Sequence, residues 1–472
     1  MTSRFHFVGI GGIGMSALAQ ILLARGQAVS GSDLVESEMT ERLSTLGARV
    51  SIGHQAENVT GADRVVISDA VHEDNPEVRR VRELGIPVQR RSELLAELAS
   101  ARRCVAVAGT HGKTTVTAMI GLVMVEAGLD PTIVLGGEYK PIGGNARAGE
   151  GDWLLAEACE AYESFLDLRP AIAVVTNIEP DHLDHHGTEE HLRQSFARFL
   201  ERVTQGGVVV LCADRPELRA LPLQRGRRVV RYGADASADV RGVAIETKGI
   251  NGSCRVLVDG IEAGRLTVSV PGTHNVINAL GAVAACREAG APMATCIEAL
   301  AKFSGVDRRF EVLGEGSGVT VVDDYAHHPT EIAATVAAAR TAFPGRRIVA
   351  VFQPHLYSRT RDFAEGFAEA LRAADMTVLT EVYPAREAPI PGVDSGLIAD
   401  HLRELTVAES ARGEDAVIEM SKHEVSAKLP PILRAGDVVL AMGAGDIGHI
   451  ARELACRLGI HPACPHQAGA TQ

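Results

Sequence analysis

The most chemically specific stretch of the sequence is GTHGKTT at residues 109–115. It follows an apolar run at 104–108 that predicts a buried strand, and it precedes a stretch with helical composition. Backbone amides in such a strand-to-helix turn can cradle phosphate, while Lys113 can neutralise a phosphate oxygen and the Thr114 hydroxyl can bind Mg²⁺. A complete phosphate-loop motif would have Gly where this chain has Val107. The remaining pattern still predicts ATP binding.

A second glycine loop, GIGGIG at residues 9–14, also follows an expected strand and begins an expected helix. Missing side chains let a pyrophosphate approach backbone amides at the positive end of that helix. Asp33 lies where a ribose-binding carboxylate would stand in a dinucleotide-binding fold. By itself the pattern leaves three readings open: a dinucleotide, another diphosphate ligand, or only a tight turn.

Acidic residues and histidines follow two further strands, as EACE at 157–160 and DHLD at 181–184. Carboxylate oxygens are suitable ligands for Mg²⁺, which keeps waters and phosphates in its remaining positions. His182 alone is more typical of a loop hydrogen bond than of a magnesium ligand. The adjacent His185 and His186 raise the alternative of zinc, but no cysteine accompanies them and their spacing is not that of a helical zinc pair, so zinc is disfavoured.

Other polar segments are ambiguous without context. GTHN at 272–275, with Asn278 one turn later, is either a helix cap with a surface amide or part of a binding site. The paired arginines in DRRF at 307–310 either face solvent or reach a phosphate. Three more polar clusters follow strands near the C-terminus and predict a second substrate surface; these clusters are DDYAHHP (323–329), QPHLYSRT (353–360) and GAGD (443–446).

Short β-branched runs alternate with Ala/Leu-rich stretches along the chain, which predicts α/β domains with parallel sheets. Every cluster described above falls just past the carboxyl end of an expected strand, where open α/β sheets bind ligands. From 228 to 270 the segments become polar and glycine-broken, which predicts an antiparallel insertion. We predict a Rossmann-like domain at 1–103, a P-loop-type ATPase domain at 104–309, a Rossmann-like domain at 310–460 and a loose tail at 461–472.

Composition excludes several classes of protein. The 472 residues carry 47 Lys plus Arg against 60 Asp plus Glu, a formal net charge of −13, which does not suit a general nucleic-acid or anionic-membrane binder. The eight cysteines form no CxxC pair, and we expect reduced thiols in a cytoplasmic protein. No secretory signal is expected, and no apolar run reaches the roughly 20 residues that a membrane-spanning helix needs.

Taken together, these motifs resemble the Mur ligases, and within that family the branch that adds alanine. The resemblance covers nearly the whole chain in order. The blocks are GIGGIGMSALA from Gly9, GSD from Gly31, AGTHGKTT from Ala108, EACE from Glu157, TNIEPDHLD from Thr176, PGTHNVINA from Pro271, SGVDRRFE from Ser304, DDYAHHPTEI from Asp323, QPHLYSRT from Gln353 and GAGDI from Gly443.

The resemblance implies roles for individual residues. UDP-sugar binding would fall to Gly11, Gly12, Ile13, Gly14, Asp33 and Ser68. ATP binding would fall to Gly109, Thr110, His111, Gly112, Lys113, Thr114, Thr115, His274, Asn275, Asn278, Arg308 and Asp324. The metal would be held by Thr114, Glu157 and His182, and the amino acid by Tyr325, His327 and Arg359. Catalytic roles would fall to Lys113, Arg308 and His327.

The activity that this resemblance implies is ATP-dependent joining of L-alanine to the lactyl carboxylate of UDP-N-acetylmuramate through an acyl phosphate, in peptidoglycan precursor synthesis. ATP would be a co-substrate and Mg²⁺, or Mn²⁺, the metal. No nucleic acid or membrane insertion is expected, and the protein would be a monomer or a weak homodimer. We also expect the third domain to close over the second, since water would otherwise hydrolyse the acyl phosphate.

Three features of the sequence test this assignment. The segment 190–196 has no lysine, whereas ligases that extend the peptide further carry a carbamylated lysine there, which favours the alanine-adding branch. Leu356 stands where many members have Arg, and Asp69 differs from the family's usual residue in the segment near the uridine nucleotide.

Three alternative functions remain: an NAD-dependent oxidoreductase, a ligase that attaches a recycled tripeptide to the same UDP-sugar, and a non-enzymatic UDP- or ATP-sensing module.

Overall fold

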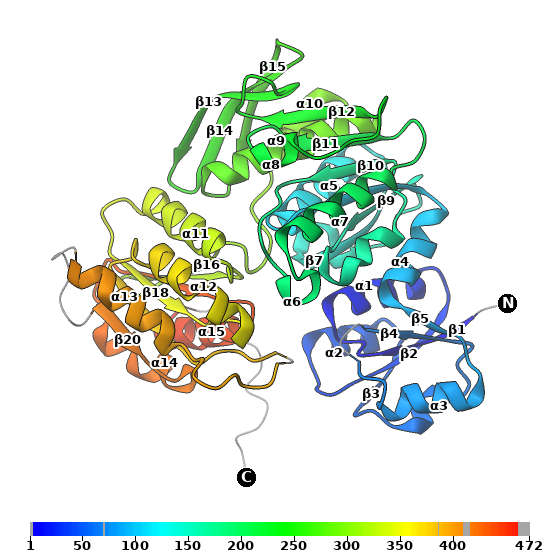
Figure 1. The fold of residues 1–472 in the computed structure, drawn as a ribbon, viewed down its shortest axis with the longest axis horizontal. Coiled ribbons are helices and arrows are strands. Elements are labelled where there is room, and N and C mark those ends of the chain that lie inside the picture. Colours follow the sequence, from blue (N-terminus) through cyan, green and yellow to red (C-terminus); the bar gives the residue numbers. More distant parts are fainter. Residues whose placement is uncertain (1–2, 69–70, 386, 409–415, 461–472) are drawn as a thin grey trace. The chain divides into compact units, whose positions relative to one another are not determined.

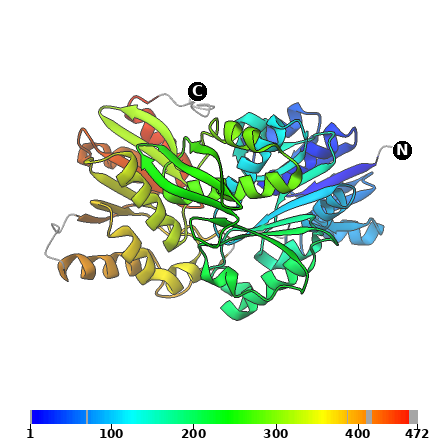
Figure 2. The ribbon, with the colours of Figure 1, turned by 90° about the horizontal axis from the view of Figure 1, so that it is seen from above.

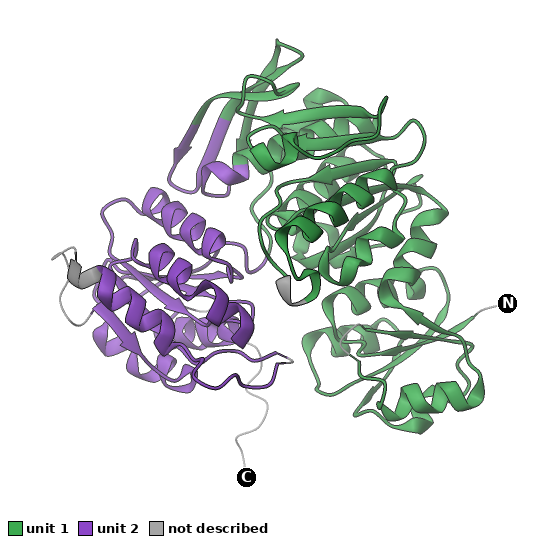
Figure 3. Cartoon of the chain, in the orientation of Figure 1, with its two compact units in different colours: residues 1–245, 254–268, 276–306 green, residues 246–253, 269–275, 307–472 purple. Residues whose placement is uncertain are grey.

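The computed structural model describes residues 3–68, 71–385, 387–408 and 416–460. These residues form two compact units, one of 1–245, 254–268 and 276–306, and the other of 246–253, 269–275 and 307–472 (Figures 1 and 3). Asp69 and the expected tail at 461–472 lie outside the described residues. The predicted domain boundaries stay a prediction.

The first sheet contains the glycine loop of residues 9–14. Its five strands are all parallel, in the order β3-β2-β1-β4-β5 that characterises nucleotide-binding α/β folds. The strands are β1 (Arg4–Val8), β2 (Ala28–Asp33), β3 (Arg49–Ile52), β4 (Arg64–Ile67) and β5 (Val88–Arg90), and the helices are α1 (Ile13–Ala24), η1 (Ala56–Val59), α2 (Glu38–Thr45), α3 (Pro76–Leu84) and α4 (Arg91–Ser100).

The second sheet has ten strands in the order β15-β14-β13-β12-β11-β10-β6-β9-β7-β8. Its central strands are apolar along their whole length, because helices cover both faces of a parallel sheet. Figures 1 and 2 show α5, α9 and α10 on one face and α7 on the other. The strands are β6 (Arg103–Ala108), β7 (Thr132–Tyr139), β8 (Gly144–Arg147), β9 (Trp153–Glu157), β10 (Ile172–Val175), β11 (Val208–Cys212), β12 (Arg228–Gly233), β13 (Val240–Lys248), β14 (Asn251–Val258) and β15 (Ile261–Val268).

The helices of this part of the chain differ in how much of their surface is covered. Helix α5 is buried continuously from Thr114 to Met124, and its apolar residues occur all round it rather than on one stripe. The helices are α5 (Lys113–Glu126), η2 (Lys140–Ile142), η3 (Ala161–Asp167), α6 (Leu183–His186), α7 (Glu189–Glu201), α8 (Pro216–Arg219), α9 (Thr273–Ala289) and α10 (Met293–Leu300).

The antiparallel insertion expected at 228–270 is only partly correct. Strand β12 pairs parallel to β11, and β13 pairs parallel to β12 through Tyr232 and Val240, so the parallel order continues into this segment. Only two residues separate β13 from β14 and β14 from β15, a connection that suits antiparallel hairpins. The prediction began too early because β12 is only partly buried and therefore carries polar residues.

The sheet of the other unit has six strands, in the order β16-β17-β21-β18-β19-β20, and only β16 runs antiparallel. Apolar side chains form a core on each face of it. Its strands are β16 (Glu311–Gly316), β17 (Val319–Asp324), β18 (Ile348–Phe352), β19 (Met376–Leu379), β20 (Val417–Glu419) and β21 (Val438–Met442), and its helices are α11 (Pro329–Ala342), α12 (Tyr357–Leu371), α13 (Gly396–Ala408), α14 (Lys422–Lys428), η5 (Pro430–Ile432) and α15 (Ile447–Arg457).

Candidate active site

The GTHGKTT loop lies between β6 and α5, as its sequence predicts. Gly109 and Gly112 have φ angles of +131° and +82°, a region that residues with a Cβ rarely adopt. A Cβ at Gly109 would also collide with the hydroxyl of Thr176. The loop backbone therefore depends on both glycines.

The loop is fixed by residues that follow the neighbouring strand β10. The amide of His111 donates to Asn177 Oδ1 at 2.9 Å, and the Thr176 hydroxyl donates to the His111 carbonyl at 2.6 Å. The amide of Glu179 donates to the Thr110 hydroxyl at 2.9 Å. Sequence reasoning did not single out Asn177, although its place directly after a strand beside β6 is a usable signal.

Lys113 is held by a buried carboxylate that the sequence analysis quoted but gave no role. Its Nζ donates to Glu160 Oε1 at 2.9 Å, to the Gly109 carbonyl at 2.5 Å and to the Thr110 carbonyl at 3.1 Å. Burial alone would lower the pKa of Lys113, but the negative charge of Glu160 raises it above the ordinary value. The ammonium therefore stays charged beside the loop, and it must exchange one of these acceptors to reach a phosphate.

Glu157 brings together two of the predicted metal ligands. Its Oε2 accepts from the Thr114 hydroxyl at 3.1 Å, and its Oε1 accepts from the Gly136 amide at 2.6 Å. His182 has a φ of +53°, its amide donates to Asp181 Oδ1 at 2.8 Å, and its ring is partly exposed. A hydroxyl, a carboxylate and an accessible imidazole are donors that Mg²⁺ or Mn²⁺ accepts.

Three of the residues expected to bind ATP, His274, Asn275 and Asn278, fall into two groups. Asn278 lies against the phosphate loop, because a Cβ at Gly112 would stand 3.1 Å from Asn278 Oδ1. Asn275 is buried and its Nδ2 donates to the Pro271 carbonyl at 2.7 Å, which is a local cap. The His274 ring folds back over Gly272. The ATP assignments of these residues stay predictions.

The first glycine loop is organised by the end of strand β2. The amides of Gly9 and Ile10 both donate to the Ser32 carbonyl, at 2.8 and 2.9 Å. The amide of Gly11 donates to Asp33 Oδ2 at 2.8 Å. Asp33 therefore shapes the loop itself, beside any contact that it makes to a ribose.

Two other strand ends reach the same loop. Gly9 approaches Ser68, which follows β4, closely enough that an added Cβ would stand 3.6 Å from the Ser68 Cβ. A Cβ at Gly14 would stand 3.1 Å from the Arg91 side chain. The structure thus gathers Ser68 and Asp33 at the predicted loop and adds Arg91, the first residue of α4, which no sequence motif indicated.

A buried amide joins helix α1 to the second sheet. Asn145 on β8 is fully buried, and its Nδ2 donates to the Ile13 carbonyl at 2.7 Å and to the Ser16 hydroxyl at 2.9 Å. Its Oδ1 accepts from Gln20 at 2.7 Å. The helix that begins at the first glycine loop is therefore fixed to the sheet that carries the second.

In the other unit, Arg308 is held within its own sheet. Its Nη2 donates to the Gly443 carbonyl at 2.8 Å, and its Nε lies 3.4 Å from Asp323 Oδ2. Its guanidinium lies 5.1 Å from the centroid of the Tyr325 ring. Asp323 is fully buried and was not singled out from the sequence.

Asp324 organises the loops on either side of it. Its Oδ2 accepts from the Phe310 amide at 2.8 Å and its Oδ1 from the Ala326 amide at 2.7 Å. Burial raises the pKa of Asp324 to about 6, although the charge of Arg309 and these two amides partly oppose the shift. The pKa of this carboxyl therefore lies closer to neutral pH than that of an ordinary aspartate.

Two of the three residues predicted to surround the amino acid, His327 and Arg359, contact a further residue, His355, and the third, Tyr325, packs against His327. The rings of Tyr325 and His327 lie 5.3 Å apart, and those of His327 and His355 lie 5.9 Å apart. Arg359 is buried, with its Nη1 3.2 Å from His355 Nδ1. Leu356 directly precedes helix α12, and its φ of +69° is a strained conformation for a residue with a side chain.

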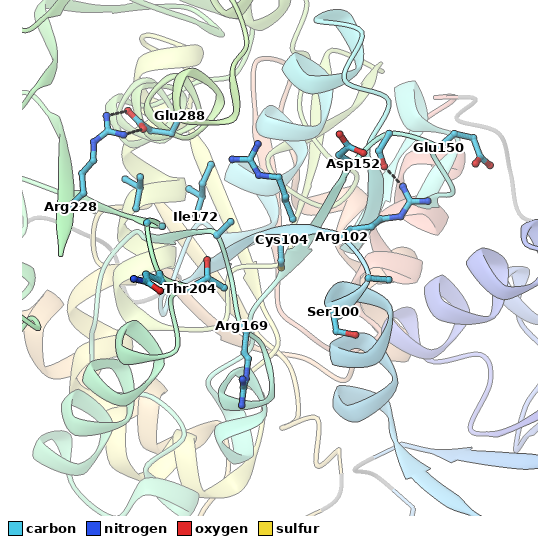
Figure 4. A pocket seen from close by; sticks show the side chains of 18 residues that line it. Ser100, Arg102, Cys104, Glu150, Asp152, Arg169, Ile172, Thr204, Arg228 and Glu288 are labelled. Carbon is cyan, nitrogen blue, oxygen red and sulfur yellow. Dashed lines mark hydrogen bonds and ion pairs between the residues drawn. The ribbon is translucent and has the colours of Figure 1, made fainter. Parts of the chain in front are cut away.

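A cavity of about 760 Å³ lies at the end of the second sheet opposite the GTHGKTT loop, where strands β6, β10, β11 and β12 begin (Figure 4). Arg228 pairs there with Glu288 at 2.6 Å, and the Arg103 guanidinium covers the Trp153 ring at 4.0 Å. Asp152 and Glu150 also line it. Arg102 also lines it and donates to the Gly149 carbonyl at 3.0 Å, so part of the positive charge of this cavity is already matched within the protein.

Comparison with known proteins agrees with this fold and these motifs. Residues 4–103 match the model "Mur ligase family, catalytic domain", residues 107–286 match "Mur ligase middle domain", and residues 308–445 match "Mur ligase, glutamate ligase domain". These features define a three-domain α/β ligase with mainly parallel sheets, as the sequence predicts. The chain belongs to the Mur ligase family.

Individual relatives extend over nearly the whole chain. It is 48% identical to a UDP-N-acetylmuramate–L-alanine ligase of Sorangium cellulosum over 96% of both chains. It is 46% identical to a protein of the same name from a Geobacter species over 96% of this chain and 97% of that one. Helices of the described part of the chain all lack the length and apolarity needed to span a membrane.

Solved structures give the same result. The UDP-N-acetylmuramate-alanine ligase of Thermotoga maritima superposes with a TM-score of 0.81 at 31% identity, covering 96% of this chain and 98% of that chain. A murein peptide ligase of Psychrobacter arcticus superposes with a TM-score of 0.71 at 25% identity, over 97% and 99% of the two chains.

Proposed function

We propose that this protein is an ATP-dependent ligase that joins L-alanine to the lactyl carboxylate of UDP-N-acetylmuramate, in peptidoglycan precursor synthesis. The observation that carries the proposal is the charged Lys113 beside a loop of oriented amides, in a chain 48% identical to a ligase of that name. Membership of the Mur ligase family argues against the oxidoreductase and the sensing module.

The chemistry requires activation of a carboxylate, because its oxygen is a poor leaving group. The γ-phosphoryl group of ATP passes to the lactyl carboxylate: the bond from its phosphorus to the β–γ bridging oxygen breaks, ADP leaves, and an acyl phosphate forms. The amine of L-alanine attacks that carbonyl through a tetrahedral intermediate, the C–N bond forms, and inorganic phosphate leaves. Phosphoryl transfer of this kind depends on position and electrostatics, so no side-chain nucleophile is needed.

This chain's residues would act by charge and orientation. Lys113 and the phosphate loop at the start of helix α5 would offset the charge on the transferring group, and Arg308 would add a second cation. His327 Nδ1 lies 2.9 Å from the Tyr325 carbonyl. If that nitrogen donates to the carbonyl, the other nitrogen of the neutral ring is an acceptor suited to the proton of the alanine amine.

Mg²⁺, or Mn²⁺, would be held by Thr114, Glu157 and His182, and when bound it would neutralise phosphate charge. The 3.1 Å contact between Thr114 and Glu157 supports two members of that set. We further propose that the domain at 310–460 supplies the amino-acid site, that it closes over ATP, and that the protein is cytoplasmic and a monomer or weak homodimer.

Phosphate release tests this function. Purified protein with ATP, Mg²⁺ and UDP-N-acetylmuramate should release phosphate with L-alanine and much less with the recycled tripeptide. If the tripeptide is the better substrate, the peptide-recycling alternative is correct. Oxygen-18 in the lactyl carboxylate should appear in the released phosphate, and its absence would exclude the acyl phosphate.

A further inference from the structure

A buried carboxylate that the proposed reaction does not use lies beneath the first glycine loop. Glu77 is in the first turn of α3 and its side chain is fully buried. Four groups from three other segments lie within hydrogen-bonding distance of it. They are the Ser32 hydroxyl at 2.7 Å, the Asn58 amide group at 2.6 Å, the Gln55 backbone amide at 3.2 Å and His6 Nε2 at 3.2 Å. In addition, His54 Nδ1 lies 3.7 Å from its Oε1.

These contacts keep Glu77 ionised. Burial alone would raise the pKa of Glu77, but hydrogen bonds from His6, Asn58 and Ser32 lower it below the ordinary value. A buried charge is costly unless it is fully hydrogen-bonded, and removal of its charge leaves those donors unmatched. A carboxylate in this place is therefore a strong constraint on the groups around it.

The constraint reaches the glycine loop through Ser32. The Ser32 hydroxyl donates to Glu77, and the carbonyl of the same residue accepts the amides of Gly9 and Ile10. Because the hydroxyl hydrogen is committed to Glu77, His54 Nδ1, at 2.9 Å, is the donor to Ser32 Oγ. His6 lies on β1 three residues before the loop. Glu77 therefore contacts both strands that position the loop, β1 through His6 and β2 through Ser32.

We propose that Glu77 is a positioning residue for the diphosphate of the UDP-sugar. It touches no substrate; it acts through Ser32 and His6 by holding the Gly9 and Ile10 amides in place. This role rests on the proposed function, since it assumes that the first loop binds the UDP-sugar. The role itself concerns the loop and can be measured without any ligand.

The test is Glu77→Gln, which keeps the size of the side chain and removes its charge. We expect the KM for UDP-N-acetylmuramate to rise about tenfold, the usual effect of breaking one buried hydrogen bond to a charged group, with kcat and the KM for ATP nearly unchanged. Hydrogen exchange of the Gly9 and Ile10 amides should be faster than in the wild type. Should this variant fail to fold, Ser32→Ala removes only the hydroxyl contacts to Glu77 and His54 and should shift both measurements in the same direction.

Glu97→Gln is the matched control. Glu97 belongs to the same domain and pairs with Arg64 at 2.7 Å on the surface, so neither measurement should change. Unchanged exchange and unchanged KM in Glu77→Gln would overturn the positioning role. Faster exchange in a protein whose wild type does not bind UDP-N-acetylmuramate would instead keep the role and reject the proposed function.

Discussion

The two glycine loops of this chain have the same local architecture but opposite chemistry. Each follows a strand of a parallel sheet and begins a helix. At the first loop the carboxylate of Asp33 accepts a hydrogen bond from the Gly11 amide, and the fully buried carboxylate of Glu77 lies close by. In the second loop a cation, Lys113, is held between loop carbonyls and Glu160.

The difference follows from what each ligand does. A diphosphate that is only held needs oriented amides, and its charge does not change during the reaction. A phosphoryl group in transfer develops charge that a nearby cation must offset. If the proposed function is correct, the first loop is organised for binding and the second for reaction, a distinction that a glycine pattern alone does not make.

Removal of the cation tests the reacting loop most directly. Lys113→Ala should lower kcat on the order of 10²- to 10³-fold, because one oriented donor to the transferring group is lost. Phosphate release under saturating substrates measures the effect. Lys302→Ala, which removes an exposed lysine paired with Glu126 at the end of the same helix α5, is the control. A Lys113→Ala enzyme with half of its activity left would remove the distinction between the loops.

Asp324 extends the comparison to a carboxyl buried without a lysine. Its pKa of about 6 lies above that of the unfolded chain, so the folded state binds more protons. Stability from this group is present below pH 4 and is lost as pH rises to 6, a change of about 3 kcal/mol. Asp324→Asn should therefore compare more favourably with the wild type at pH 7.5 than at pH 4.5 in chemical unfolding. A pH-independent difference would contradict the shift.

Asn145 tests whether the two loops are mechanically linked. Asn145→Ala leaves the Ile13 carbonyl and Gln20 without their buried partner. Unfolding free energy should fall by about 1–3 kcal/mol, the cost of unsatisfied buried polar groups. Thermal or denaturant unfolding measures it. A variant as stable as the wild type would mean that packing alone joins α1 to β8.

Asp33 separates binding from reaction at the first loop. Asp33→Ala frees the Gly11 amide and removes a carboxylate, so the KM for UDP-N-acetylmuramate should rise about tenfold while the KM for ATP stays the same. Steady-state kinetics with each substrate varied in turn gives both constants. Equal changes in both would show that Asp33 acts on the whole fold and not on one loop.

Much of this fold is predictable from the sequence, because a short window is enough to identify strands with continuous apolar runs and helices that end at a glycine. Strand β12 was misjudged because its partly buried surface carries the polar residues of an antiparallel strand. Pairing partners depend on the whole sheet, which no local window contains. The alternation of strands and helices predicts three α/β domains in this order, and the family resemblance adds the expected role of each.

Site residues that belong to one short motif could be predicted from the sequence. Residues that contact them from distant parts of the chain could not. Thr114 and Lys113 stand out from a single motif. Glu160 is separated from Lys113 by 47 residues, and His355 becomes relevant only when the fold places it against His327 and Arg359. Arg91 has no signal at all, since an arginine at a helix start is ordinary.

The cavity where β6, β10, β11 and β12 begin has a practical consequence for inhibitor design. At about 760 Å³ it has room for a drug-sized molecule, yet its walls are charged pairs such as Arg228 with Glu288. A compound chosen to fill it would displace pairings that already satisfy each other and would leave both glycine loops untouched. Inhibitor design should therefore be directed at the two glycine loops and not at this cavity.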